Sequence, residues 1–255
     1  MQFLSHVVHF FATASSWSGP DGILVRLGHQ TELSVAAALA AALVGVGLGS
    51  LLGHSGRGGF VVVNAANAAR AVPSVALLTL LAIQPVIARH SRGGLVPAFI
   101  AMFALAVPPV LTNAYVGVRN VDADVRSAAF AMGMTDAQVL WRVELPLAAP
   151  LVMAGVRTAA VEVVATATLA AYVGFSDLGS YIFAGLATQN TVETFSGALL
   201  VAVLALVTDL ALAFAGRAVT PAGVRRSGRA ARQLRVGADV STVPPAGAPK
   251  APATT

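Results

Sequence analysis

The sequence predicts an all-α integral membrane protein, and three observations support that fold class. The chain of 255 residues is 56% apolar and only 11% charged, and its mean hydropathy is +0.78. A water-soluble domain of this length carries far more charge. Five segments are apolar over the length of about 20 helical residues that crosses the hydrocarbon. Cysteine is absent, which excludes disulfides and thiolate metal sites.

The five predicted transmembrane helices follow one another along most of the chain. They are Ser34–Leu52, about Phe60–Ala88, Gly93–Val118, about Leu147–Val173 and Phe195–Gly216. Gly45, Gly49 and Gly53 recur every four residues along the first of them, so another helix can approach closely on that face. The spacing predicts tight helix packing, either within this chain or against a second subunit.

Basic residues divide the chain into three parts and predict its orientation. Residues 1–30 are expected to be a retained external or interfacial segment, 31–216 the membrane domain, and 217–255 a basic tail whose composition is typical of disorder. With the tail inside the cell, the inner loops and tail hold eleven Lys or Arg and the outer loops three. The positive-inside rule therefore predicts an external N-terminus and a cytoplasmic C-terminus. A basic tail beside a membrane span favours the headgroups of the lipid bilayer over nucleic acid.

The connection between the third and fourth spans, about residues 119–146, predicts two short helices with a bend between them. The residues at helical spacing on one apolar face of the first helix are Val121, Val125, Ala129 and Met132. Gly133 is expected to break that helix, Asp136 to start a second turn, and Pro146 to end it where the next span begins. An apolar helix face outside the membrane suits the groove of a partner protein.

Motifs in this loop and beyond it resemble those of a known family. Ser127-Ala128-Ala129, then Gly133, then Val143-Glu144-Leu145-Pro146 resemble the cytoplasmic EAA loop of permease subunits of bacterial ABC importers. Further motifs are similar to the MetI-like branch that imports glycine betaine, choline, carnitine and related osmoprotectants. In chain order these are AVPSVALL from Ala71, MGMT from Met132, VELPLA from Val143, AGVRTA from Ala154 and GFSDLG from Gly174. Together they cover about residues 30–216.

The resemblance implies a type I ABC importer permease in a bacterial plasma membrane, whose loop helix docks in a cleft of a separate ATPase subunit. The residues carried over to this coupling loop are Ser127, Ala128, Ala129, Met132, Gly133, Met134, Thr135, Glu144 and Pro146. The chain departs from the family at Ser127, where Glu is usual, and so loses a charge that bonds the partner or caps the helix. Asp122 or Asp124 is the expected substitute at the helix start, where negative charge is favourable.

ATP hydrolysis is expected to belong to another polypeptide. The P-loop motif needs a glycine-rich loop followed by Lys, and the only lysine is Lys250 in the tail. The chain is thus predicted to be no enzyme and to use no cofactor. The resemblance implies separate ABC ATPase subunits, a second permease subunit, identical or related, and an extracellular solute-binding protein. An amino-acid or methionine permease, an ATP-independent secondary carrier and a membrane scaffold without transport stay open as alternatives.

Residues that interrupt the apolar spans mark a candidate translocation path. Pro73 and the pair Pro108-Pro109 remove backbone hydrogen bonds, and the carbonyls they free must find neighbours or line a water-filled path. We assign Pro73 and Pro109 to this path together with Asn113, the expected partner of a freed carbonyl. Glu162 in the fourth span completes the assignment.

Glu162 and Asp209 are carboxylates inside predicted spans, where an ionisable group is costly unless it faces water or a partner. For a cationic or zwitterionic solute, Glu162 is suited to attract the ammonium end. A bond from Glu162 to a polar group on a neighbouring helix is an equally good interpretation. Asp209 is expected to pair with Arg217 or to lie near the cytoplasmic interface.

Overall fold

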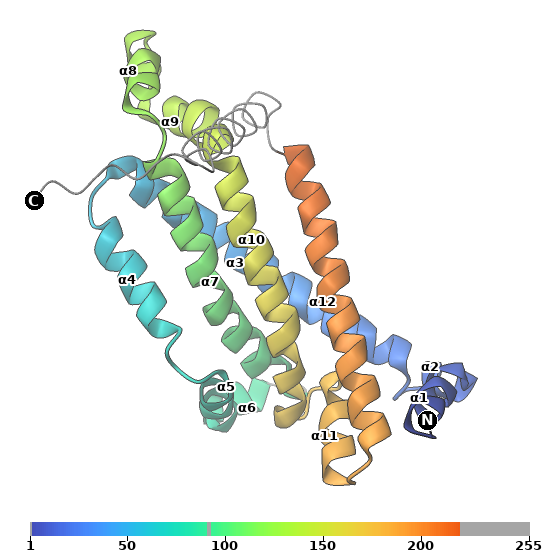
Figure 1. Cartoon of the computed structure of the whole chain (residues 1–255). Coiled ribbons are helices and arrows are strands. Elements are labelled where there is room, and N and C mark those ends of the chain that lie inside the picture. Colours follow the sequence, from blue (N-terminus) through green and yellow to red (C-terminus); the bar gives the residue numbers. More distant parts are fainter. Residues whose placement is uncertain (1, 91–92, 220–255) are drawn as a thin grey trace, which may run out of the picture.

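The fold consists of helices joined by short turns and contains no strand in residues 2–90 and 93–219, which are the residues described by this computed structural model (Figure 1). The helices in chain order are α1 (Gln2–Ala12), α2 (Ala14–Trp17), α3 (Ile23–Ser55), α4 (Gly59–Ala69), α5 (Ser74–Ile83), α6 (Pro85–His90), α7 (Leu95–Arg119), α8 (Ala123–Ala131), α9 (Asp136–Val139), α10 (Leu145–Ala167), α11 (Gly179–Ala187) and α12 (Thr191–Val219). A π-helical turn, η1 (Leu140–Glu144), precedes α10, and a 3-10 turn, η2 (Thr168–Val173), follows it. The all-α prediction is confirmed.

Four helical stretches in the described part of the chain are long and apolar enough to cross a membrane. They are α3, α7, the continuous helix from Asp136 to Val173, and α12. The pair α4 and α5 makes a fifth candidate that is bent by 82°. Pro73 stands at the N-cap of α5, where its missing N–H cannot continue the hydrogen bonding of α4. The predicted break at Pro73 is confirmed, and the five predicted spans are present when the bent pair is counted as one.

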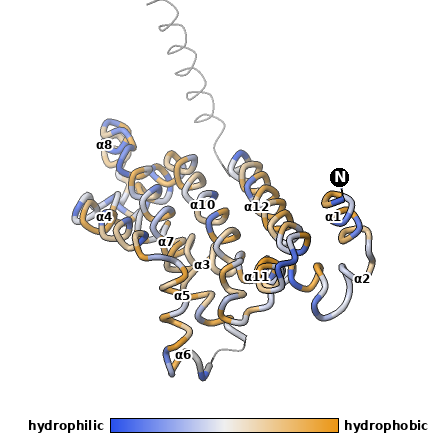
Figure 2. The backbone as a smooth tube through the Cα atoms, turned by 60° about the horizontal axis from the view of Figure 1, so that its bottom comes forward, coloured by the Kyte–Doolittle hydropathy of each residue, from blue (hydrophilic) through white to orange (hydrophobic). Residues whose placement is uncertain are grey.

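Apolar residues predominate along the long helices, whereas hydrophilic residues gather at α8 and at the tips of loops (Figure 2). This distribution matches a bundle whose middle lies in hydrocarbon and whose ends lie in water. The loop helices α8 and α9 lie at the same end of the bundle as the C-terminal ends of α3, α7 and α12, and α1, α2 and α11 lie at the other end (Figure 1). From residue 220 onward, the predicted tail lies outside the described residues.

The first span is longer than predicted. Helix α3 begins at Ile23, well before Ser34, so the segment assigned to residues 1–30 ends in the first turns of a helix. Arg26 in these turns is accommodated by Asp21 at 3.2 Å and by the ring of Tyr181, whose centroid lies 4.3 Å away. Helix α11 was not predicted either, because it is too short to meet a transmembrane criterion.

The glycine stripe of α3 packs against α7 of the same chain. A Cβ atom placed on Gly45 would lie 2.7 Å from the Cβ of Val110, and one on Gly49 would lie 2.5 Å from the carbonyl oxygen of Leu111. No real Cβ makes such contacts, so only glycine permits the two backbones to approach this closely. The predicted close packing is therefore found, and the neighbour belongs to this chain.

Helix α7 forms the centre of the bundle and stays continuous through its two prolines. Pro108 and Pro109 are both buried, and the core around them includes Ala106 and Val110. Asn113 donates from Nδ2 to the carbonyl oxygen of Pro109 at 2.8 Å. The carbonyls that the two prolines free belong to the turn before them, so the expectation that Asn113 satisfies a freed carbonyl is wrong.

Helix α12 lies at the edge of the bundle against α10 and α11, and few of its residues are buried (Figure 1). An ion pair joins it to α10, because Arg157 donates to both carboxylate oxygens of Asp209. Of the two expectations for Asp209, the pairing with Arg217 is wrong, because its carboxylate is bonded to Arg157. Arg157 offers Asp209 a partner at the same depth in the bundle.

Candidate functional site

The first loop helix, α8, projects beyond the ends of the long helices (Figure 1). Its N-cap is Asp122, whose Oδ1 accepts a hydrogen bond from the backbone N–H of Asp124 at 2.8 Å. Asp124 lies in the first turn, where its negative charge interacts favourably with the positive end of the helix dipole. The expectation that these aspartates serve the helix start in the absence of a Glu at Ser127 is confirmed for capping.

The outward surface of α8 differs in part from the predicted apolar face. Val125, Phe130 and Met132 are exposed large apolar side chains, whereas Ala129 is 2% exposed and faces the rest of the chain. The idea that Ala129 shares an outward face with Val125 and Met132 is therefore wrong. Ser127 and Ala128 are exposed, so a partner reaching this helix meets small residues flanked by large apolar ones.

Gly133 forms the bend after α8, as predicted. Its φ of +82° lies in the left-handed region, which a β-carbon disfavours, and a Cβ added there would meet no atom within 4 Å. The N–H of Met134 bonds the carbonyl of Ala129, which closes the end of the helix. Thr135 then caps α9 in a reciprocal capping box with Gln138.

Pro146 does not end the second loop helix, which corrects the prediction. The helix runs without a break from Asp136 to Val173, and Pro146 lies in the first turn of α10. The turn before it is π-helical, and the N–H of Leu145 bonds the carbonyl of Leu140 five residues back. A π turn shifts the hydrogen bonding by one residue, which allows the helix to pass a proline without breaking. The second loop helix is thus continuous with the membrane helix α10.

Glu144, at the end of this π turn, joins the loop to the ends of the membrane helices. Its carboxylate is fully buried, accepts from Nε of Arg126 on α8 at 2.5 Å, and lies 2.7 Å from Nδ1 of His54 on α3. Nη2 of Arg126 also donates to the carbonyl of Val118 at the end of α7, at 3.3 Å. One buried carboxylate therefore connects α8 and α10 directly with α3, and through Arg126 with α7.

A second polar group lies within the bundle, on the face formed by α4, α7 and α10. Nη2 of Arg70, at the end of α4, donates to both carboxylate oxygens of Glu162 on α10 at 2.9 and 3.1 Å. Of the two interpretations of Glu162, the bond to a neighbouring helix is thus realised. The side chains are 38% and 27% exposed, so the pair is open to its surroundings.

Polar side chains continue this face on both sides of the ion pair. Thr112 of α7 donates to Oδ1 of Asn67 on α4 at 3.4 Å. Thr158 and Thr166 flank Glu162 at helical spacing on α10, and their hydroxyl groups bond carbonyls of their own helix. Of the path residues predicted from sequence, only Glu162 takes part in the polar contacts of this face. Asn113 is half-buried on α7, and Pro109 is buried. Pro73 is exposed in the turn between α4 and α5.

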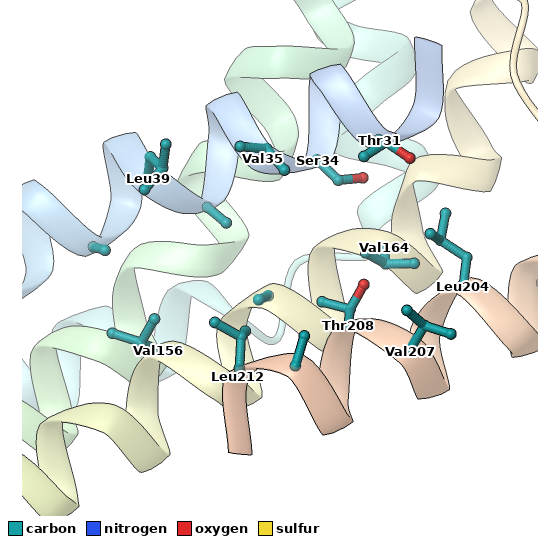
Figure 3. A pocket seen from close by; sticks show the side chains of 14 residues that line it. Thr31, Ser34, Val35, Leu39, Val156, Val164, Leu204, Val207, Thr208 and Leu212 are labelled. Carbon is teal, nitrogen blue, oxygen red and sulfur yellow. The ribbon is translucent and has the colours of Figure 1, made fainter. Parts of the chain in front are cut away.

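An apolar groove lies on the opposite side of α10 (Figure 3). It has a volume of about 360 Å³ between α3, α10 and α12, and its only polar lining groups are the hydroxyls of Thr31, Ser34 and Thr208. Its α10 residues, Val156 and Val164 among them, lie on the reverse of the helix from Glu162, given about 100° of turn per residue. A groove without a carboxylate offers nothing to balance a cationic group, so the polar face is the better candidate for contact with a charged solute.

Sequence reasoning missed the partners of the buried charges. The sequence patterns assign no partner to His54, Arg126 or Arg70. Each pairs with a residue far along the chain, and a single sequence carries no signal for such a pair; only the presence of unpaired charges in apolar spans gives a hint.

Comparison with known proteins agrees with this architecture. The family described as "binding-protein-dependent transport system inner membrane component" matches residues 34–222. The choline transport system permease protein OpuBB of Bacillus subtilis is 36% identical over 88% of this chain and 98% of its own length. The carnitine transport permease protein OpuCB of Listeria monocytogenes is 35% identical over 80% of this chain and 91% of its own length.

Solved structures show the same fold. A chain of the methionine ABC transporter MetNI in an inward-facing conformation superposes with a TM-score of 0.68 at 22% identity, covering 78% of this chain and 97% of that one. The helical bundle, the projecting loop helix and the sequence match over most of the chain lead to one assignment. The chain belongs to the family of inner-membrane components of binding-protein-dependent transport systems, as a multi-pass membrane permease.

Proposed function

We propose that this chain is the permease subunit of an ATP-driven importer for osmoprotectant solutes with a quaternary ammonium group, such as glycine betaine, choline or carnitine. The relatives that match most of the chain carry choline, carnitine and glycine betaine in their names, and this supports the solute class. The half-exposed carboxylate of Glu162 suits a positively charged group. Because the chain itself lacks a P-loop, ATP hydrolysis is assigned to separate ABC ATPase subunits.

The observation that carries the coupling part of the proposal is the connection through Glu144. Helix α8 projects from the bundle with exposed apolar side chains, and its Arg126 is bonded to a carboxylate buried among the ends of the long helices. A displacement of α8 by an ATPase subunit is therefore passed to α10 and α3 directly rather than absorbed by a loose loop. The coupling-loop residues Ser127, Ala128, Met132 and Gly133 lie on or next to the exposed part of this helix.

The orientation in the membrane and the other two partners belong to the same proposal. The end of the bundle with α8 and α9 faces the cytoplasm, where the arginine-rich loops predict it to be. The opposite end, with α11, faces outward toward an extracellular solute-binding protein. A second permease subunit, identical or related, covers the open polar face of α4, α7 and α10. Contact between this face and the lipid hydrocarbon would be costly, because the face carries charged side chains.

An amino-acid permease is the second candidate from the same fold. The fold likeness to the methionine transporter supports the architecture, but at 22% identity it says nothing of the solute. An ATP-independent carrier is a candidate from another class, and the exposed loop helix argues against it because such a carrier has no use for a docking element.

Reconstitution tests the proposal. The chain is assembled with its ATPase subunits and solute-binding protein in liposomes, and the uptake of labelled glycine betaine, choline, carnitine and methionine is measured with and without ATP. We expect uptake of at least one quaternary-ammonium solute only when ATP and the binding protein are present. Uptake of methionine alone, or accumulation by the chain without ATPase subunits, would contradict the proposal.

A cysteine crosslink tests the docking of α8 separately. A cysteine placed at Ser127, which is exposed, is expected to crosslink to an ATPase subunit. A cysteine at Ser18, which is exposed at the other end of the bundle, is the matched control and is expected not to crosslink.

A further inference from the structure

We propose that Arg70 and Glu162 form a divided binding site for zwitterionic solutes, in which Arg70 receives the carboxylate and Glu162 the quaternary ammonium group. The inference rests on the proposed function and adds a residue, Arg70, and a preference among solutes. It makes the carboxylated solutes, such as glycine betaine and carnitine, the preferred cargo over the simple cation choline.

The position of the pair is the first argument. Glu162 lies on α10, on the order of 16 Å from the end of the helical stretch at Val173 for a rise of 1.5 Å per residue. Arg70 lies at the C-cap of α4, where the break before Pro73 ends the helix and where a cation is favoured by the helix dipole. The pair is 38% and 27% exposed, and Asn67 and Thr112 extend a polar surface beside it. A polar surface of this extent is costly against hydrocarbon, so we assign the pair to a water-filled path.

The unused bonding capacity of the pair is the second argument. Both bonds to Glu162 come from Nη2 of Arg70, so Nη1 and Nε of the guanidinium find no partner among the residues that the structure describes. A planar guanidinium binds carboxylates with two parallel N–H groups, and Arg70 has donors left for a second carboxylate. The half-exposed carboxylate of Glu162 can in turn receive a cation beside Arg70.

Charge balance decides which solutes this arrangement favours. A zwitterion that enters between the two side chains replaces one ion pair by two, so neither charge is left alone in a medium of low dielectric constant. A simple cation that binds Glu162 leaves the guanidinium of Arg70 without its counter-ion, which carries an energetic penalty. Asn67 and Thr112, on the α4 and α7 sides, add uncharged polar groups that tolerate either solute.

The chain offers a matched control for the test. Arg157 also pairs with a carboxylate from within a span, is 44% exposed and lies on the same helix as Glu162, but its partner is Asp209 on α12. Arg157→Gln therefore removes an intramembrane ion pair on another side of α10 and leaves the polar face intact. The comparison of Arg70→Gln with Arg157→Gln separates an effect on solute preference from a general loss of stability.

The experiment measures initial uptake rates of glycine betaine, carnitine and choline by the complete importer in liposomes. For Arg70→Gln we expect the rates for glycine betaine and carnitine to fall about tenfold relative to the rate for choline, since a charge-assisted hydrogen bond contributes 1.5 kcal/mol or more and each 1.4 kcal/mol is tenfold. Arg70→Lys is expected to recover part of the loss. Arg157→Gln is expected to leave the ratio of the rates as in the wild type.

The outcomes separate the inference from the proposed function. If the wild type takes up these solutes with ATP but Arg70→Gln and Arg157→Gln change all rates alike, the divided site is wrong and the permease assignment stands. A wild type that carries choline alone also overturns the divided site. A wild type that carries only glycine betaine and carnitine supports the divided site if Arg70→Gln abolishes their uptake and Arg157→Gln does not. A wild type that carries none of the three removes both proposals.

Discussion

Glu144 and His54 lie 90 residues apart in the chain, and a carboxylate oxygen of one lies 2.7 Å from Nδ1 of the other. The carboxylate is fully buried and also bonds Arg126, so it ties the loop to two membrane helices. A buried carboxylate that loses its charge leaves its cationic partner without compensation. The contribution of this connection to the free energy of unfolding can be measured.

Glu144→Gln is expected to lower the free energy of unfolding by about 3 kcal/mol, because removing one partner of a buried ion pair leaves the other uncompensated. The measurement is a denaturant titration of the purified permease in detergent. Glu32→Gln is the control: Glu32 is exposed on α3, and its change is expected to stay within about 0.5 kcal/mol. Equal stability of the two variants would show that Glu144 does not hold the loop to the bundle.

Gly133→Val is expected to separate ATP hydrolysis from transport. A β-branched residue disfavours the φ of +82° at this bend, so α8 leaves its position while the spans stay inserted. The cost arises from the backbone, since a Cβ meets no atom within 4 Å. The readouts are ATPase activity and solute uptake of the reconstituted importer.

Gly133→Asn is the matched variant, because Asn adopts the left-handed region far more readily than Val. We expect it to keep most of the coupling. Normal uptake by Gly133→Val would contradict a role for the bend.

Gly49→Val is expected to disrupt the packing of α3 on α7. A Cβ at Gly49 would lie 2.5 Å from the carbonyl oxygen of Leu111, and backbone cannot yield as a flexible side chain does. Overpacking of this kind costs about 3 kcal/mol. The yield of monodisperse protein and its thermal midpoint measure the effect.

Gly47 provides the comparison within the same helix. A Cβ at Gly47 would meet nothing within 4 Å, so Gly47→Val is expected to fold as the wild type does. Loss of folding in both variants would point to helix propensity rather than to the close approach of α3 and α7.

The fold was predictable because its signals are local. Apolar length gave the spans, Pro73 the break between α4 and α5, and Gly133 the bend, since each depends on residues next to one another in the chain. Pro146 was misjudged because its effect depends on the π turn before it, in which Leu145 bonds Leu140. A proline in the sequence does not reveal whether the preceding turn can widen.

The polar contacts of the site were not predictable in the same way. Glu144 and Glu162 were identified, but their partners His54 and Arg70 come from elements far along the chain. Which charge meets which depends on how α3 and α4 pack against α10, and this packing is a property of the folded bundle. For the same reason the sequence favours Arg217, the nearer neighbour along the chain, as the charged partner of Asp209, whereas the partner in the bundle is Arg157.

The last prediction concerns Asp177, which is fully buried in the connection between η2 and α11, outside the candidate spans. Neither carboxylate oxygen makes a well-formed hydrogen bond with the described residues. Burial raises the pKa of Asp177 to about 7, and the backbone N–H groups of Gly179 and Ser180 and the charge of Arg26 oppose this rise only in part. The folded protein therefore binds a proton more tightly than the unfolded chain does.

Stability is expected to fall as the pH rises from about 4 to 7, because in this range the folded state must lose a proton that the unfolded state has already released. The loss is on the order of 4 kcal/mol and levels off above the folded-state pKa. Asp177→Asn removes the ionisation, so this variant is expected to be more stable than the wild type at pH 8 and to show no such gain at pH 4. Thermal midpoints of both proteins across this range check the prediction, and parallel pH profiles would refute the assignment of the effect to Asp177.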